Sequence, residues 1–125
     1  DRVSRLIAEA GLKPTEAILI HKPSNIFYLS GFSAKQAPGW QAHNISTQVN
    51  HIRLAAQLLA QRNTGAVRFE DDYITVKSHT AMEAAFDGIP LTPLTQLPEK
   101  LRTIKDEQEL ALIEKACIIS CQALD

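Results

Sequence analysis

The side chains in this chain that could do chemistry are few and widely spaced. Cys117 and Cys121 lie four positions apart, which places them on one face of a predicted helix, a poor geometry for an unstrained disulfide. Two cysteines could also bind a metal, but a zinc site needs three or four protein ligands. We therefore expect both to be small buried hydrophobic residues in a reducing compartment. A cysteine–histidine nucleophilic pair stays open as an alternative, without a local sequence signature to support it.

Two other groups of polar residues suggest catalysis or metal binding. His79 and Glu83 lie four positions apart on a predicted helix and could share a metal, yet a hydrolytic site needs at least three ligands, so we expect a solvated face. The run Glu70-Asp71-Asp72 offers carboxylates for acid–base work. Since it precedes a predicted helix, we interpret it as the favourable negative charge of that helix N-terminus.

The composition excludes several classes of function. The chain has 125 residues with 45% hydrophobic residues and a formal net charge of -1, which is typical of one globular domain with its own core. Basic residues are scattered among acidic ones, so no nucleic-acid-binding face is expected. No apolar run is long enough for a membrane span, and the beginning of the chain does not resemble a signal peptide. We expect a soluble cytoplasmic protein.

Helices and short apolar strands alternate along the chain. Apolar residues at helical spacing predict helices over 2–10, 25–29, 49–59, 73–86 and 107–124, the second one capped by Ser24. Continuous apolar runs predict a central strand over 17–20, a strand over 66–69 and an edge strand over 89–91. Asp106 followed by Glu109 is a capping-box pattern, and behind it an apolar stripe continues to the end of the sequence. We therefore expect the natural protein to continue.

This alternation indicates an α/β domain in which helices cover both faces of a mixed β-sheet. We assign residues 1–105 to that domain and residues 106–125 to a linker helix.

Three separated stretches resemble one known family. Asn25, Tyr28, Gly31 and Phe32 belong to the first stretch, which comprises 5–12, 17–20 and 23–32. The second stretch covers 67–75 and includes Glu70, and the third covers 101–116. In this order they resemble the N-terminal domain of the prolidase, aminopeptidase P and creatinase family, which has a ribonuclease H-like motif.

The resemblance implies a function that this chain does not perform alone. It implies a C-terminal catalytic domain in which two aspartates, a histidine and two glutamates hold two divalent metal ions of the Mn, Co or Zn type. It also implies a homodimer that cleaves proline-containing peptides, with Phe32 and Ser33 near the substrate of the neighbouring subunit. We expect no catalytic residue and no metal ligand in this chain. A peptide- or protein-binding module, and the N-terminal domain of a creatinase-like amidinohydrolase, stay open as alternatives.

The sequence departs from the family at one point. After Ala34 the family continues through a paired hairpin, whereas here Lys35 follows directly. Either the hairpin was lost or residues are missing between the two positions. We expect the second, because losing two strands would expose sheet edges and core.

Overall fold

A three-stranded parallel sheet forms the centre of the computed structural model, which describes residues 1–31, 41, 43–48 and 50–124. The strands are β1 (Glu16–Leu19), β2 (Ala66–Phe69) and β3 (Leu91–Pro93), in the order β1-β2-β3. Glu16 pairs with Ala66, and Phe69 pairs with Pro93. The α/β fold class predicted from the sequence is confirmed. The strands in the described part of the chain all run parallel, so the antiparallel pairing of a mixed sheet does not appear among them.

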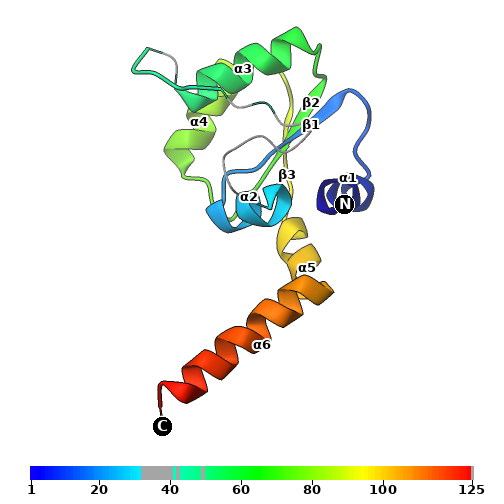
Figure 1. Cartoon of the computed structure of the whole chain (residues 1–125). Helices are drawn as coiled ribbons and strands as arrows, with labels where there is room; N and C mark the ends of the chain where they lie inside the picture. The colour runs from blue at the N-terminus through cyan, green and yellow to red at the C-terminus, as the bar shows by residue number, and fades with distance from the viewer. Residues whose placement is uncertain (32–40, 42, 49, 125) are drawn as a thin grey trace.

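Helices cover both faces of this sheet, as predicted (Figure 1). On one face, α3 (His51–Gln61) and α4 (Val76–Ala85) pack against each other and against the strands. On the other face lie α1 (Arg2–Ala10), α2 (Pro23–Ser30) and α5 (Leu97–Thr103). The chain therefore builds two cores. The first contains Val67, Phe69, Met82 and Phe86, and the second contains Leu6, Tyr28, Leu94 and Leu101.

Strand β1 contributes side chains to both cores, because successive side chains of a strand point to opposite faces. Ala17 and Leu19 pack against the first core, while Ile18 and Ile20 pack against the second. The prediction of a strand covered on both faces is therefore confirmed. Its predicted central position is wrong for the sheet that the structure describes, because β2 lies in the centre and β1 at one side.

Two helix N-termini differ from the prediction. Helix α2 begins at Pro23 with Lys22 at the N-cap position and no side-chain cap, so Ser24 lies inside the helix and does not cap it. Proline suits this first position because its missing N–H would be unpaired there anyway. Helix α4 begins at Val76, and Thr75 caps it by accepting a hydrogen bond from the N–H of Ser78. The interpretation of the acidic run 70–72 as the cap of this helix is therefore wrong.

Helix α6 (Glu107–Gln122) extends away from the rest of the molecule (Figure 1). It begins with the predicted capping box, in which Asp106 accepts from the N–H of Glu109 and Glu109 accepts from the N–H of Asp106. Arg2 binds Asp106 at 2.5 Å and so ties the beginning of α6 to α1. No residue of α6 is buried. Cys117 and Cys121 are exposed free thiols, so the prediction that they are buried is wrong.

Candidate functional site

Charged and amide side chains meet where β1 and β2 end. The loop after β1 supplies His21 and Lys22, and the residues after β2 supply Glu70 and Asp72. Because β1 and β2 are parallel, both carboxyl ends open at the same edge of the sheet, where α/β proteins commonly bind ligands. Helix α2 adds Asn25 from its first turn. Helix α5 completes the group with Glu99 and Arg102.

Glu70 is the buried centre of this group, with only 1% of its surface exposed. One carboxylate oxygen accepts hydrogen bonds from the backbone N–H groups of His21 at 2.5 Å and Lys22 at 2.8 Å. The other oxygen accepts a bond of 2.5 Å from the amide of Asn25, which is itself fully buried. A buried carboxylate needs such donors to offset its lost hydration. Glu70 therefore fixes the turn after β1 against the end of β2.

Asn25 links Glu70 to helix α5. Its amide nitrogen also donates to Glu99 at 2.7 Å, and its oxygen accepts from Arg102 at 3.0 Å. The side-chain amide thus uses both donor hydrogens and its acceptor oxygen. Burial raises the pKa of Glu99, but hydrogen bonds from Asn25 and Lys22 outweigh it, so that the pKa lies below its usual value.

Lys22 forms the outer part of the group. Its ammonium nitrogen lies 2.8 Å from an oxygen of Asp72 and 2.9 Å from an oxygen of Glu99. These hydrogen bonds, first the one to Asp72 and then the one to Glu99, raise the pKa of Lys22 above its ordinary value. The lysine is therefore held as a cation, which makes it unsuited to act as a base.

We call Lys22, Asn25, Glu70, Asp72, Glu99 and Arg102 the polar network. Its members bind one another and hold β1, β2, α2 and α5 together at one edge of the sheet. A general acid or base needs an atom directed towards a substrate, whereas the oxygens of Glu70 and the amide of Asn25 are already engaged inside the fold. The polar network is therefore a structural device. Its two buried residues, Asn25 and Glu70, belong to the stretches that resemble the peptidase family.

A cavity of about 430 Å³ lies beside the polar network, with His21 and His51 among its lining residues. The Nδ1 atom of His21 is buried and has no hydrogen-bond partner among the described residues. Burial lowers the pKa of His21, and the nearby His51 lowers it further, against the opposing effect of Glu70. His21 is therefore a neutral imidazole at neutral pH. Sequence reasoning did not single out this pair, because 30 positions separate the two histidines along the chain.

Phe32 and Ser33, the residues predicted to lie near substrate, are outside the described residues, and so is the junction between Ala34 and Lys35. The described chain reaches Gly31, which ends α2 with φ of 67°, a left-handed conformation that glycine adopts without strain. Tyr28, another aromatic residue of this stretch, is core: it is 4% exposed, and its hydroxyl donates to the carbonyl of Leu101 at 3.3 Å.

His79 and Glu83, the other candidate pair, lie together without a third metal ligand among the described residues. Nδ1 of His79 lies 3.5 Å from Glu83 on α4, and the ring of His79 packs against Phe69. Among the described residues, no three His, Cys, Asp or Glu side chains are arranged to hold a metal ion. The resemblance places its two metal ions in a separate catalytic domain, and the described residues of this chain offer no such site.

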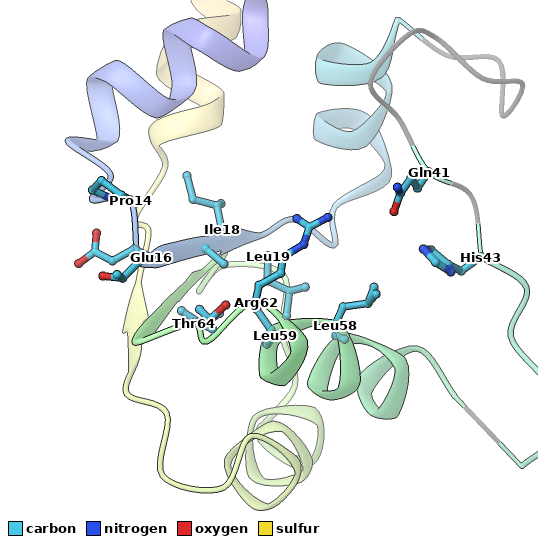
Figure 2. A pocket seen from close by; sticks show the side chains of 14 residues that line it. Pro14, Glu16, Ile18, Leu19, Gln41, His43, Leu58, Leu59, Arg62 and Thr64 are labelled. Atoms are coloured by element: carbon cyan, nitrogen blue, oxygen red, sulfur yellow. The ribbon is translucent and has the colours of Figure 1, made fainter.

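Another cavity, of about 510 Å³, lies between β1 and α3 (Figure 2). Ile18, Leu19, Leu58 and Leu59 form its apolar walls. Pro14 and Glu16 lie at one end, Gln41 and His43 lie at the other, and Arg62 reaches in between them. The sequence analysis did not predict this cavity, because nothing in the sequence distinguishes Arg62 from any other charged residue at the end of a helix.

Comparisons with known proteins give a match in structure. No family model matches the sequence, and no curated protein sequence shows a significant match. The structure resembles an Xaa-Pro dipeptidase from Bacillus anthracis, with a TM-score of 0.69 and 21% identity over 91% of this chain. It also resembles an Xaa-Pro aminopeptidase from Streptococcus pyogenes, with a TM-score of 0.63 and 24% identity over 80% of this chain.

The two solved chains differ in how much of them is matched. This chain spans 38% of the dipeptidase chain but 92% of the solved aminopeptidase chain. No helix in the described part of the chain is long and apolar enough to cross a membrane. Over most of its length, the chain therefore has an α/β fold that recurs within these two Xaa-Pro peptidase structures.

Proposed function

We propose that this chain is the non-catalytic N-terminal domain of a cytoplasmic, proline-specific metallopeptidase of the creatinase and prolidase family. The observation that carries the proposal is the unequal coverage of the dipeptidase, 91% of this chain against 38% of the longer one. A domain of a larger enzyme would match in this way. The order of the three sequence stretches and the structural role of Asn25 and Glu70 within two of them support the same assignment.

In this proposal, residues 1–105 form the domain and residues 106–125 form the linker to the catalytic domain. The surface of α6 supports a linker that packs against further protein. Leu110 and Ile113, which are 54% and 46% exposed, lie on one side of the helix, while Leu112 and Ile119, which are 68% and 57% exposed, lie on another. A helix that is apolar on more than one side is normally buried.

The proposed contribution of the domain is positional. It takes part in forming a homodimer and in capping the substrate cleft of the neighbouring subunit, where Phe32 and Ser33 contact a proline-containing peptide. Closing a cleft and orienting a peptide can speed a reaction without a catalytic group in the closing segment. The two divalent metals belong to the catalytic domain, and no step of the reaction is assigned to the residues described above.

Two experiments test the proposal: an activity assay on the chain alone and sequencing of its coding region. The purified 125-residue chain, incubated with an Xaa-Pro dipeptide and Mn²⁺, should release no proline. Sequencing the region that encodes the residues after Asp125 should reveal two aspartates, a histidine and two glutamates as metal ligands. Proline release that scales with the amount of this chain would contradict the proposal.

The same coding region separates the proposed peptidase from both alternatives. A binding module of a non-peptidase relative would lack the five ligands, and so would a creatinase-like amidinohydrolase. In the complete enzyme, Phe32→Ala should lower kcat/KM for a proline peptide while the metal content and the dimer are unchanged. An unchanged kcat/KM would remove Phe32 from the substrate site.

A further inference from the structure

Helix α6 is attached to the rest of the described chain at its beginning. No residue of α6 is buried, and none belongs to either core. The helix extends away from the sheet (Figure 1). Two ion pairs join the first turn of α6 and its N-cap to another element within the described residues, and both come from Arg2 of α1. The direction of α6 therefore depends on Arg2 and on the short connection over 104–106.

Arg2 is itself anchored to the folded domain. Its guanidinium lies over the ring of Tyr28, with the guanidinium carbon 4.6 Å from the ring centre. Nη1 of Arg2 donates to the carbonyl of Tyr28 at 3.0 Å, one of the last carbonyls of α2, which lack a partner within their helix. A positive charge also suits the negative C-terminal end of a helix. Because Tyr28 is buried in the second core, Arg2 has a fixed support.

The same guanidinium contacts both carboxylates of the capping box. Nη2 of Arg2 lies 2.5 Å from Oδ2 of Asp106 and 3.2 Å from Oε1 of Glu109. The capping box uses the other oxygen of each carboxylate, because Oδ1 of Asp106 and Oε2 of Glu109 accept from the backbone. Each carboxylate thus has one oxygen for the helix and one for Arg2. The hydrogen bond from Arg2 is the main cause of the lowered pKa of Asp106, which keeps this carboxylate ionised at neutral pH.

We propose that Arg2 is a positioning residue, which fixes the direction of α6 by joining its capped N-terminus to the C-terminal end of α2. A single exposed ion pair restricts geometry weakly, whereas a planar guanidinium shared by two carboxylates, a carbonyl and a ring accepts few orientations. The proposal concerns the chain itself and needs no catalytic domain. In the proposed peptidase the same contact sets the direction in which α6 leads to the catalytic domain, and this consequence alone rests on the proposed function.

Pulsed electron paramagnetic resonance on the whole 125-residue chain measures the direction of α6. One spin label is attached to Cys117 of α6 after Cys121→Ser, and the other to the thiol introduced by Lys77→Cys on the exposed surface of α4. Labelled chain is diluted with unlabelled chain, so that only distances within one molecule are measured. The chain with Arg2 should give a single narrow distance distribution, and Arg2→Gln should lose it in favour of a broad one.

A second variant separates this contact from the folding of α6. Asp106→Asn combined with Glu109→Gln keeps side chains that can form the capping box but removes both negative charges. It should broaden the distance distribution as Arg2→Gln does, while circular dichroism shows an unchanged helix content. Adding Arg2→Gln to this variant should broaden the distribution no further, because both changes remove the same contact.

Two further variants control for the charge of α1. Arg5→Gln, which removes an exposed arginine from α1, should keep the narrow distribution. Arg2→Lys should restore only part of it, since an ammonium does not replace the planar fork of a guanidinium. The proposal is overturned if the unmodified chain already gives a broad distribution. It is also overturned if the distribution stays narrow in Arg2→Gln or in the variant that carries Asp106→Asn and Glu109→Gln.

Discussion

The polar network and helix α6 place side chains in opposite ways: the polar network buries polar groups, whereas α6 exposes apolar ones. The polar network buries charged and amide groups, and each of its two buried members has several hydrogen-bond partners inside the fold. Helix α6 exposes isoleucines and leucines, and none of its residues is buried. The first region is complete within this domain, whereas the second leaves apolar surface that another molecule or domain would cover.

This difference shows that the residues which identify a fold need not be the residues that bind a substrate. Asn25 and Glu70 belong to two of the stretches that carry the family resemblance, yet their bonds hold α2, β1 and β2 together and leave no group for a substrate. The exposed side of α6, in contrast, carries no distinctive motif but leaves leucine and isoleucine side chains uncovered. A distinctive motif can therefore indicate a fold without indicating a site.

Removing the carboxylate of Glu70 should have the largest effect. Glu70→Ala leaves the N–H groups of His21 and Lys22 without their acceptor and removes one partner of buried Asn25. We expect the free energy of unfolding to fall by about 3 kcal/mol, the usual cost of breaking a buried charged group from its partners. Urea unfolding followed by circular dichroism measures this change.

The matched control is Glu114→Ala, which removes a carboxylate from the exposed surface of α6. Its unfolding midpoint should stay close to that of the unmodified chain. If both variants unfold at the same urea concentration, the polar network is not the structural device that its hydrogen bonds indicate.

The pH dependence of stability should show a smaller effect from the same region. Burial, assisted by His51, lowers the pKa of His21 below its ordinary value of 6.5 in spite of Glu70. As pH falls, the unfolded chain therefore binds this proton before the folded chain does. The contribution of His21 is fully present above pH 6.5 and is lost as the pH falls from there through the lower, folded pKa.

Urea titrations between about pH 7 and pH 5 measure this loss, because the free imidazole titrates near the upper part of that range. His21→Gln should flatten the slope over this interval, while His43→Gln, which changes an exposed histidine, should keep it. An unchanged slope in His21→Gln would show that the buried imidazole does not set the acid sensitivity.

Much of the fold could be predicted from local patterns. The helix over 2–10, the strand over 66–69 and the capping box at Asp106 and Glu109 agree with the structure, since each depends on neighbouring residues. The N-terminus of α4 was misplaced because three acids before a helix look like a cap, whereas Glu70 bonds to residues 45 to 49 positions away. Only tertiary contacts distinguish these two uses of an acid.

The sites were harder to predict for a related reason. Cys117 and Cys121 continue the spacing of an apolar stripe, and that spacing indicates a buried face only if something covers the helix. The cavity between β1 and α3 depends on how a strand and a distant helix pack, which the sequence of Ala17 and Ile18 does not encode. Arg62 becomes notable only because its side chain lines that cavity.

The smallest effect on stability is expected in α6, where a charge on the apolar stripe should barely disturb the folded domain. Ile113 is 46% exposed, and α6 contributes no residue to either core, so Ile113→Asp should change the free energy of unfolding by no more than about 0.5 kcal/mol. Leu101→Ala, in the core beside Tyr28, is the contrast and should lower the free energy of unfolding by about 2 to 5 kcal/mol.

Sedimentation then tests whether the exposed stripe of α6 brings copies of the chain together. If copies of the chain associate through α6, Ile113→Asp should weaken that association, because burying an unpaired carboxylate in an apolar contact is costly. A large loss of stability in Ile113→Asp would instead show that α6 packs against its own domain in solution, and the contrast between the self-contained polar network and the uncovered helix would no longer hold.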